Sequence, residues 1–115
     1  MSTATERLAE LGVTLPPVPP PVAAYLPAVR TGNLVYTSGQ LPTVAGELVA
    51  TGRVGAEVPA HDAAAAARVC VLNALAAVDA LVGLDSVRRV VKLVGFVASA
   101  PGFTGQPMVI NGASE

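Results

Sequence analysis

The run at residues 87–98 places the strongest constraint on how this chain can fold. With the two-residue period of a strand, both of its faces are apolar, with Val91, Leu93 and Val97 on one and Val90, Val94, Phe96 and Ala98 on the other. Such a strand is typical of the centre of a sheet that is covered on both sides. One amphipathic helix layer covers one face only, so we expect the second face to pack against another subunit.

The composition agrees with this expectation. Hydrophobic residues make up 52% of the 115 positions and charged residues only 13%. The chain is too apolar for intrinsic disorder and is short enough for one domain, which we expect over residues 1–115. A domain of this size has a modest core, and its surplus apolar surface often belongs to a partner subunit.

Residues 60–82 have the strongest helical pattern in the chain. Apolar residues recur at helical spacing on one side and polar residues lie on the opposite side, with Ala67, Val71, Ala74, Val78 and Val82 against His61, Arg68 and Asp79. The alanine run 63–67 favours a helix and lets a neighbouring element approach closely. Gly83 follows the last apolar position and predicts the helix end.

Weaker signals indicate the remaining elements. Residues 3–11 predict a short helix, and the proline-dense stretch that continues to residue 22 predicts an extended arm. Two β-rich runs within 25–38 flank a Gly-Asn turn and predict a hairpin. A weak strand is expected at 47–51, and a second helix is expected to begin within 108–113.

Charge and targeting signals exclude several classes of protein. The formal net charge is −1 and there is no basic stripe, so we expect no nucleic-acid partner. The N-terminus lacks the pattern of a secretory signal, and six prolines interrupt the longest uncharged run, 11–29, so we expect no membrane span. The lone Cys70 cannot form an internal disulfide, which fits a reducing, cytoplasmic location.

Several side chains of potentially catalytic or metal-binding type are expected to have structural roles instead. Cys70 is expected to be a buried small hydrophobe, and His61 an exposed surface residue. One histidine and one cysteine nine residues apart make no metal site, and no phosphate-binding glycine loop is present. Asp62, Asp79 and Asp85 lie near helix ends, where capping and dipole roles explain them.

The predicted hairpin has a more specific pattern. The string Gly32-Asn33-Leu34-Val35-Tyr36-Thr37-Ser38-Gly39-Gln40-Leu41-Pro42 resembles the signature of the RidA (YjgF-type) reactive intermediate deaminase family, also described as the endoribonuclease L-PSP family. The similarity continues in order through the helix at 60–82, the run Leu84–Val97 and the stretch Met108–Ala113. Ser-Gly-Gln alone is a weak signal, whereas the ordered set over about 22–115 is specific.

The resemblance implies an α+β fold with a mixed β-sheet and two helices packed on one face, as in chorismate-mutase-like proteins. It also implies a homotrimer with ligand pockets between subunits. The implied activity is hydrolysis of small enamine or imine acids, such as 2-aminoacrylate, to keto acids and ammonia. No metal and no organic cofactor are expected, and the partner is a small imino acid or carboxylate.

The resemblance also implies substrate-binding residues. Tyr25 matches the aromatic residue at the pocket wall, Ser38 and Gly39 match the signature that contributes backbone to the pocket, and Asn111 matches the pocket asparagine. Two of these residues have a structural alternative. Tyr25 can simply pack on the proline arm, and Gly39 can serve backbone geometry alone.

The chain departs from the family pattern at the catalytic groups. The family's carboxylate-gripping arginine and its water-positioning glutamate come from strands after the second helix, a region beyond Glu115. We therefore assign no catalytic residue, treat the chain as C-terminally truncated and expect weak or absent hydrolysis. Whether it acts as an enzyme stays open. The alternatives are a non-catalytic small-molecule-binding or regulatory trimer, a chorismate-mutase-type enzyme and a ribonuclease.

Overall fold

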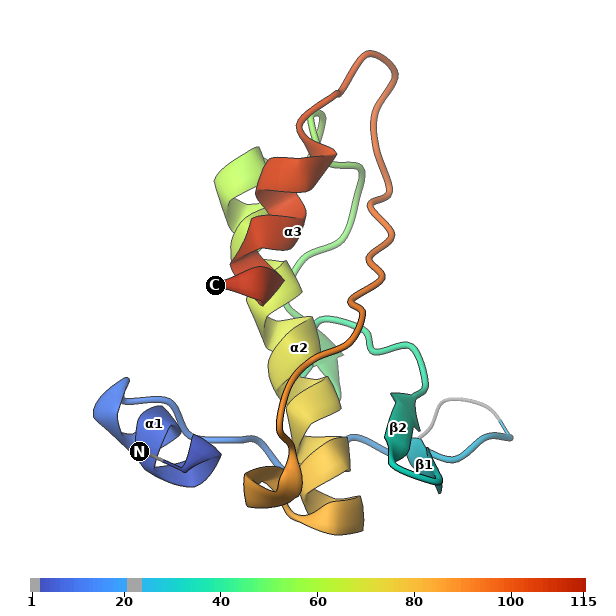
Figure 1. Cartoon of the computed structure of the whole chain (residues 1–115). Coiled ribbons are helices and arrows are strands. Elements are labelled where there is room, and N and C mark those ends of the chain that lie inside the picture. Colours follow the sequence, from blue (N-terminus) through green and yellow to red (C-terminus); the bar gives the residue numbers. More distant parts are fainter. Residues whose placement is uncertain (1–2, 21–23) are drawn as a thin grey trace. The chain divides into compact units, whose positions relative to one another are not determined.

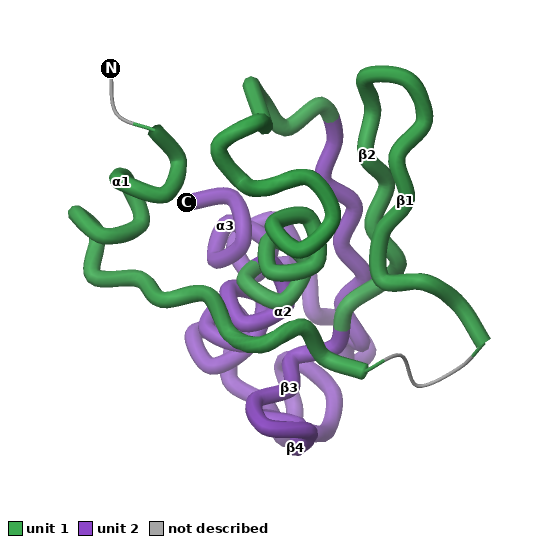
Figure 2. Tube along the Cα trace, turned by 90° about the horizontal axis from the view of Figure 1, so that it is seen from below, with its two compact units in different colours: residues 1–40, 72–91 green, residues 41–71, 92–115 purple. Residues whose placement is uncertain are grey.

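The computed structural model describes residues 3–20 and 24–115 and divides into two compact units (Figure 2). The first unit contains residues 1–40 and 72–91, and the second contains residues 41–71 and 92–115. The long helix α2 (Ala60–Val82) contributes its first half to the second unit and its second half to the first.

The first unit begins with helix α1 (Ala4–Glu10), close to the predicted range (Figure 1). The hydroxyl oxygen of Thr3 accepts the N–H of Glu6 at 3.1 Å, which is an N-cap bond. Gly12 ends the helix turn with a φ of 69°, a conformation that favours glycine. Between residues 13 and 20 the chain has no helix or strand, as expected for the proline arm.

Strands β1 (Ala28–Thr31) and β2 (Leu34–Thr37) form the predicted antiparallel hairpin. Thr31 pairs with Leu34, so Gly32 and Asn33 make a two-residue turn. Gly32 has a φ of 58° at the first position of this turn, where an L side chain is disfavoured. The hairpin prediction is confirmed, with strands slightly shorter than the apolar runs.

Helix α2 has the predicted bounds, and the short 3₁₀ helix η1 (Leu84–Ser86) follows Gly83. The polar side is also confirmed, because His61, Arg68 and Asp79 are exposed. The buried line differs from the predicted apolar stripe, whose members are only partly buried. The helix is instead buried along small side chains, namely Ala63, Asn73, Ala76 and Ala77. Close approach of neighbouring backbone selects small residues, and hydrophobicity alone does not reveal that selection.

The second unit contains the hairpin of β3 (Thr43–Val44) and β4 (Glu47–Leu48) and helix α3 (Gln106–Ser114). Helix α3 lies beside the first half of α2 (Figure 1), and a side chain at Gly112 would overlap the carbonyl of Ala64. The predicted close approach at the alanine run is thus confirmed. The core of this unit is the buried cluster Val54, Val58, Ala63 and Val109.

The predicted central strand at 87–98 is not formed. Backbone pairing in this region is limited to its end. The N–H of Val54 donates to the carbonyl oxygen of Ala98 at 2.8 Å, and the carbonyl oxygen of Val54 accepts the N–H of Ala100 at 2.9 Å. The apolar side chains remain exposed, with Val91 at 71% and Phe96 at 93%. A strand requires a neighbouring backbone, and none of the residues in 3–20 and 24–115 supplies one here.

The α+β class is confirmed, because residues 3–20 and 24–115 contain two two-stranded antiparallel sheets and three α-helices. Helix α2 is long and apolar enough to cross a membrane by length and composition alone. This is weak support for a span, because core helices of soluble proteins pass the same test.

Candidate ligand-binding site at the hairpin

The base of the β1–β2 hairpin is closed by one residue of the Ser-Gly-Gln signature. The N–H of Ser38 donates to the carbonyl oxygen of Pro27 at 2.9 Å, and the Ser38 hydroxyl donates to the same oxygen at 3.2 Å. Pro27 carries no N–H of its own and begins the hairpin directly before β1. Ser38 therefore acts here as a positioning residue that holds Pro27 and leaves its neighbour Gly39 at the surface.

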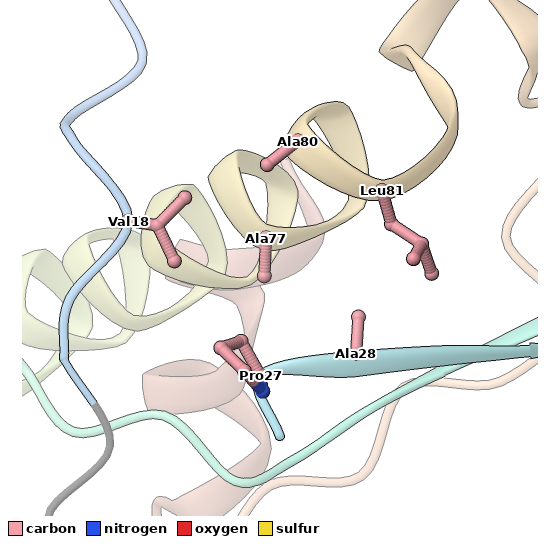
Figure 3. Close-up of a pocket in the computed structure, with 6 residues that line it drawn as sticks. All are labelled: Val18, Pro27, Ala28, Ala77, Ala80 and Leu81. Carbon is pink, nitrogen blue, oxygen red and sulfur yellow. The ribbon is translucent and has the colours of Figure 1, made fainter.

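Pro27 in turn forms one wall of an apolar cleft in the first unit (Figure 3). Ala77 and Leu81 point from α2 toward Pro27 and Ala28, and Val18 of the proline arm lies at the side of the cleft. The cleft has a volume of about 170 Å³, and its lining residues are Val18, Pro27, Ala28, Ala77, Ala80 and Leu81. This lining suits an apolar group and offers a carboxylate no side-chain partner.

Tyr25 and Gly39 lie at the surface of the same unit. Tyr25 is 38% exposed, just before β1. A Cβ built at Gly39 would have no heavy atom within 4 Å, and the φ of Gly39 is outside the left-handed region. Backbone geometry therefore does not require glycine at position 39, and the space beside it is open to a ligand or a partner. The pocket roles of Tyr25, Ser38 and Gly39 stay predictions.

Asn111, the fourth predicted residue, belongs to the second unit. It lies on an exposed position of α3, and its side-chain amide donates to the sulfur of Met108 at 3.9 Å. This weak contact leaves its polar atoms accessible to solvent. Its role in a pocket also stays a prediction.

Two cations of the first unit, Arg7 and Arg30, are engaged away from the cleft. The Nε of Arg30 donates to the carbonyl of Gly32 at 2.9 Å, and Arg7 pairs with Glu10 at 2.9 Å. Within the described ranges, no group of three or more acidic, histidine or cysteine side chains could hold a metal ion. The cleft can therefore accommodate an apolar part of a ligand, whereas carboxylate recognition needs groups that this cleft does not provide.

The surroundings of His61 and Cys70 agree with the predicted roles, an exposed surface residue and a buried small hydrophobe. The His61 side chain is 83% exposed and lies 3.0 Å from the carboxylate of its neighbour Asp62. Cys70 is half-buried on α2, and burial raises the pKa of its thiol. A protonated, half-buried thiol is a poor nucleophile, which supports a packing role.

Two features of the first unit were missed at the level of sequence. One is the Pro27 carbonyl, a backbone acceptor for Ser38. The only sequence signal for this role is the position of a proline directly before a strand. Asp85 was assigned to local capping, whereas its carboxylate accepts the N–H of Thr5 at 2.8 Å, eighty residues away. No periodicity or spacing relates two residues so distant in sequence.

The fold and the site define a class of small α+β proteins in which a Ser-Gly-Gln hairpin lies beside an apolar cleft. A family model described as "YjgF/chorismate mutase-like, putative endoribonuclease" matches residues 5–115. The chain belongs to this family.

Individual relatives agree with this assignment. Protein TCP17 of Trypanosoma cruzi is 42% identical over 110 residues, which cover 95% of this chain and 69% of that protein. A crystal structure of an Agrobacterium tumefaciens protein of unknown function has 50% identity and a TM-score of 0.81, covering 94% of this chain and 66% of that one. A "putative endoribonuclease" from Shewanella oneidensis has 28% identity and a TM-score of 0.83, covering 98% and 76%. The chain thus spans about two thirds of the first two relatives.

Proposed function

We propose that this protein is an enamine/imine deaminase of small imino acids such as 2-aminoacrylate, a compound class that family membership favours. The observation that carries the proposal is the geometry at the base of the hairpin. The Ser38 hydroxyl donates to the carbonyl oxygen of Pro27, and the space beside the neighbouring Gly39 is open. The chain spans 69% of TCP17 and 66% of the Agrobacterium protein, so the activity is a proposal for the whole protein.

The reaction needs water and no oxidant or reductant. The enamine tautomerises to the imine, and a water oxygen adds to the imine carbon. The C–N bond then breaks, ammonia leaves with the transferred protons, and the carbon becomes the keto group. A pocket that holds the carboxylate and directs one water to this carbon would accelerate the step by positioning. No step of this reaction requires a metal or an organic cofactor.

We further propose that copies of the chain complete the site as a homotrimer. The cleft of one chain provides no cation, and exposed apolar side chains on either side of residue 91 have no partner among the described residues, notably Val90, Val91, Val94 and Phe96. Burial of such side chains between subunits is favourable. A pocket between subunits would then add groups of a second chain to the cleft of the first.

Two measurements on the 115-residue chain test the deaminase proposal. Calorimetry with a small keto acid is expected to show binding that Gly39→Val removes, because the valine side chain fills the open space beside Ser38. An assay with 2-aminoacrylate generated in situ is expected to show release of ammonia above the uncatalysed rate. Absence of both binding and release contradicts the proposal. Binding with no release at all favours the non-catalytic alternative.

An RNA substrate is less well supported, although two of the matched descriptions include the word endoribonuclease. The net charge of −1 offers little attraction to phosphates, and His61 lies beside a single carboxylate on an exposed helix start. RNA affinity that falls steeply with salt would revive this alternative. Chorismate-mutase chemistry needs several cations around a dicarboxylate, and the described cleft has none.

A further inference from the structure

Helix α1 is attached to the rest of its unit by very little buried surface. None of its residues is buried, and it contacts η1. Hydrogen bonds within its own segment are local, such as the bond from the Arg7 N–H to the Thr3 carbonyl at 2.9 Å. A helix of seven residues is marginal without tertiary contacts. The contact with η1 therefore contributes to holding α1 in place.

That contact is a hydrogen bond from the start of α1 to a carboxylate. The N–H of Thr5 donates to Oδ1 of Asp85 at 2.8 Å. Thr5 lies in the first turn, where N–H groups lack partners within the helix and the dipole favours negative charge. Asp85 lies on η1, immediately after the buried Leu84, whose own N–H donates to the carboxylate of Asp79 at 2.9 Å. The acceptor is thus carried by an anchored turn.

The segment that follows α1 connects this helix to the cleft. Four prolines between residues 16 and 20 stiffen the arm, and Val18 lies among them at the side of the apolar cleft. Val18 is 37% exposed, so it lines the edge of the cleft without being buried in it. The arm therefore touches the cleft at Val18 and is held at its other end by Thr5 and Asp85.

We propose that residues 3–20 form a releasable strap that closes one side of the cleft, with the Thr5–Asp85 hydrogen bond as its clasp. When the clasp is closed, Val18 lines the cleft together with Ala77, Ala80 and Leu81. When it opens, α1 loses its anchor and the stiff arm leaves with it, so the cleft beside Pro27 becomes wider. The strap thereby controls access to the wall that Ser38 positions. This inference does not depend on the proposed reaction.

The test removes the clasp from either side. Asp85→Ala removes the acceptor, and Thr5→Pro removes the donor while keeping a residue that the first helical turn tolerates. Glu47→Ala, an exposed position on β4, is the matched control for loss of one negative charge. Hydrogen exchange is measured at the amides of residues 6–10. In a Cys70→Ala, Val18→Cys background, the rate of thiol labelling at position 18 reports on the arm.

Asp85→Ala and Thr5→Pro are each expected to raise both rates about twofold to fivefold, the range that exposed polar contacts support. The double variant should exceed neither single variant, because both remove the same bond. Asp85→Asn keeps a neutral acceptor and should lie between wild type and Asp85→Ala. Rates equal to those of Glu47→Ala, additive effects, or faster α1 exchange without faster labelling at position 18 would overturn the proposal. A thermal melt verifies that each variant is folded.

Discussion

The backbone and the side chain of Ser38 both donate to one acceptor, the carbonyl oxygen of Pro27, at 2.9 Å and 3.2 Å. Two donors on one oxygen hold the base of the β1–β2 hairpin more firmly than the backbone bond alone. The same proline lines the apolar cleft, so the hydroxyl of Ser38 influences the cleft without pointing into it.

Ser38→Ala is expected to lower the free energy of unfolding by about 1 kcal/mol, the usual contribution of one intramolecular hydrogen bond. The backbone bond to Pro27 remains, so the hairpin should still form. Urea denaturation measures the change. Ser114→Ala, which removes a hydroxyl with a longer bond of 3.4 Å on exposed α3, serves as control. Equal stability of Ser38→Ala and wild type would show that the hydroxyl contact contributes nothing.

Gly112→Ala is expected to destabilise the second unit by about 1–3 kcal/mol, the cost of overpacking a close contact. The added methyl group would meet the backbone carbonyl of Ala64, which cannot rotate away as a side chain can. Gly39→Ala is the matched control, because the space around Gly39 is open and its φ suits any residue. Thermal melts of both variants compare them, and a stable Gly112→Ala variant would contradict the close helix packing.

Asn73→Ala is expected to cost about 1–3 kcal/mol, because it removes a buried, hydrogen-bonded side-chain amide that is 1% exposed. Arg68→Ala on the exposed side of the same helix should change stability by no more than about 0.5 kcal/mol. Chemical denaturation of the two variants distinguishes a structural amide from an incidental one. Similar midpoints for both would show that Asn73 is incidental.

Attachment of α1 is expected to be stable at neutral pH and to weaken only in acid. The N–H of Thr5, and then its hydroxyl, lower the pKa of the Asp85 carboxyl below its usual range. A lowered pKa means that the stabilisation is complete above the ordinary aspartate pKa and is lost as the pH falls through the lowered value. Exchange protection of α1, corrected for intrinsic rates, should therefore be constant from pH 8 to 5 and fall below. In Asp85→Asn this acid step should be absent, and its persistence would assign it to another group.

Phe96→Ser is expected to weaken self-association without destabilising a single chain. Phe96 is 93% exposed, so the chain loses almost no packing of its own, whereas a subunit interface would lose an aromatic anchor. Sedimentation equilibrium measures the association, with Leu48→Ser on β4 as the control for loss of an exposed apolar side chain. A wild-type chain that is monomeric at micromolar concentration would contradict the proposed homotrimer.

Local sequence determined the elements whose hydrogen bonds are closed within a few residues. The bounds of α2, its end at Gly83 and the turn at Gly32 follow from periodicity and from glycine conformation, and the structure confirms them. The exposed His61 was predictable for the same reason, because helical spacing places it opposite the apolar side. The Ser-Gly-Gln signature also pointed to the family, which the comparisons confirm.

Contacts between distant segments were decided only by the tertiary structure. The apolar pattern at 87–98 has the period of a strand, yet a strand also needs a neighbouring backbone, and the described chain pairs only its end, with Val54. Likewise, nothing in the sequence around Thr5 or Asp85 relates the two, because their bond depends on where the folded chain brings α1 and η1 together. The periodicity of a segment indicates which secondary structure that segment can form. Strand pairing and hydrogen bonds between distant residues depend on which other segment the tertiary structure places beside it.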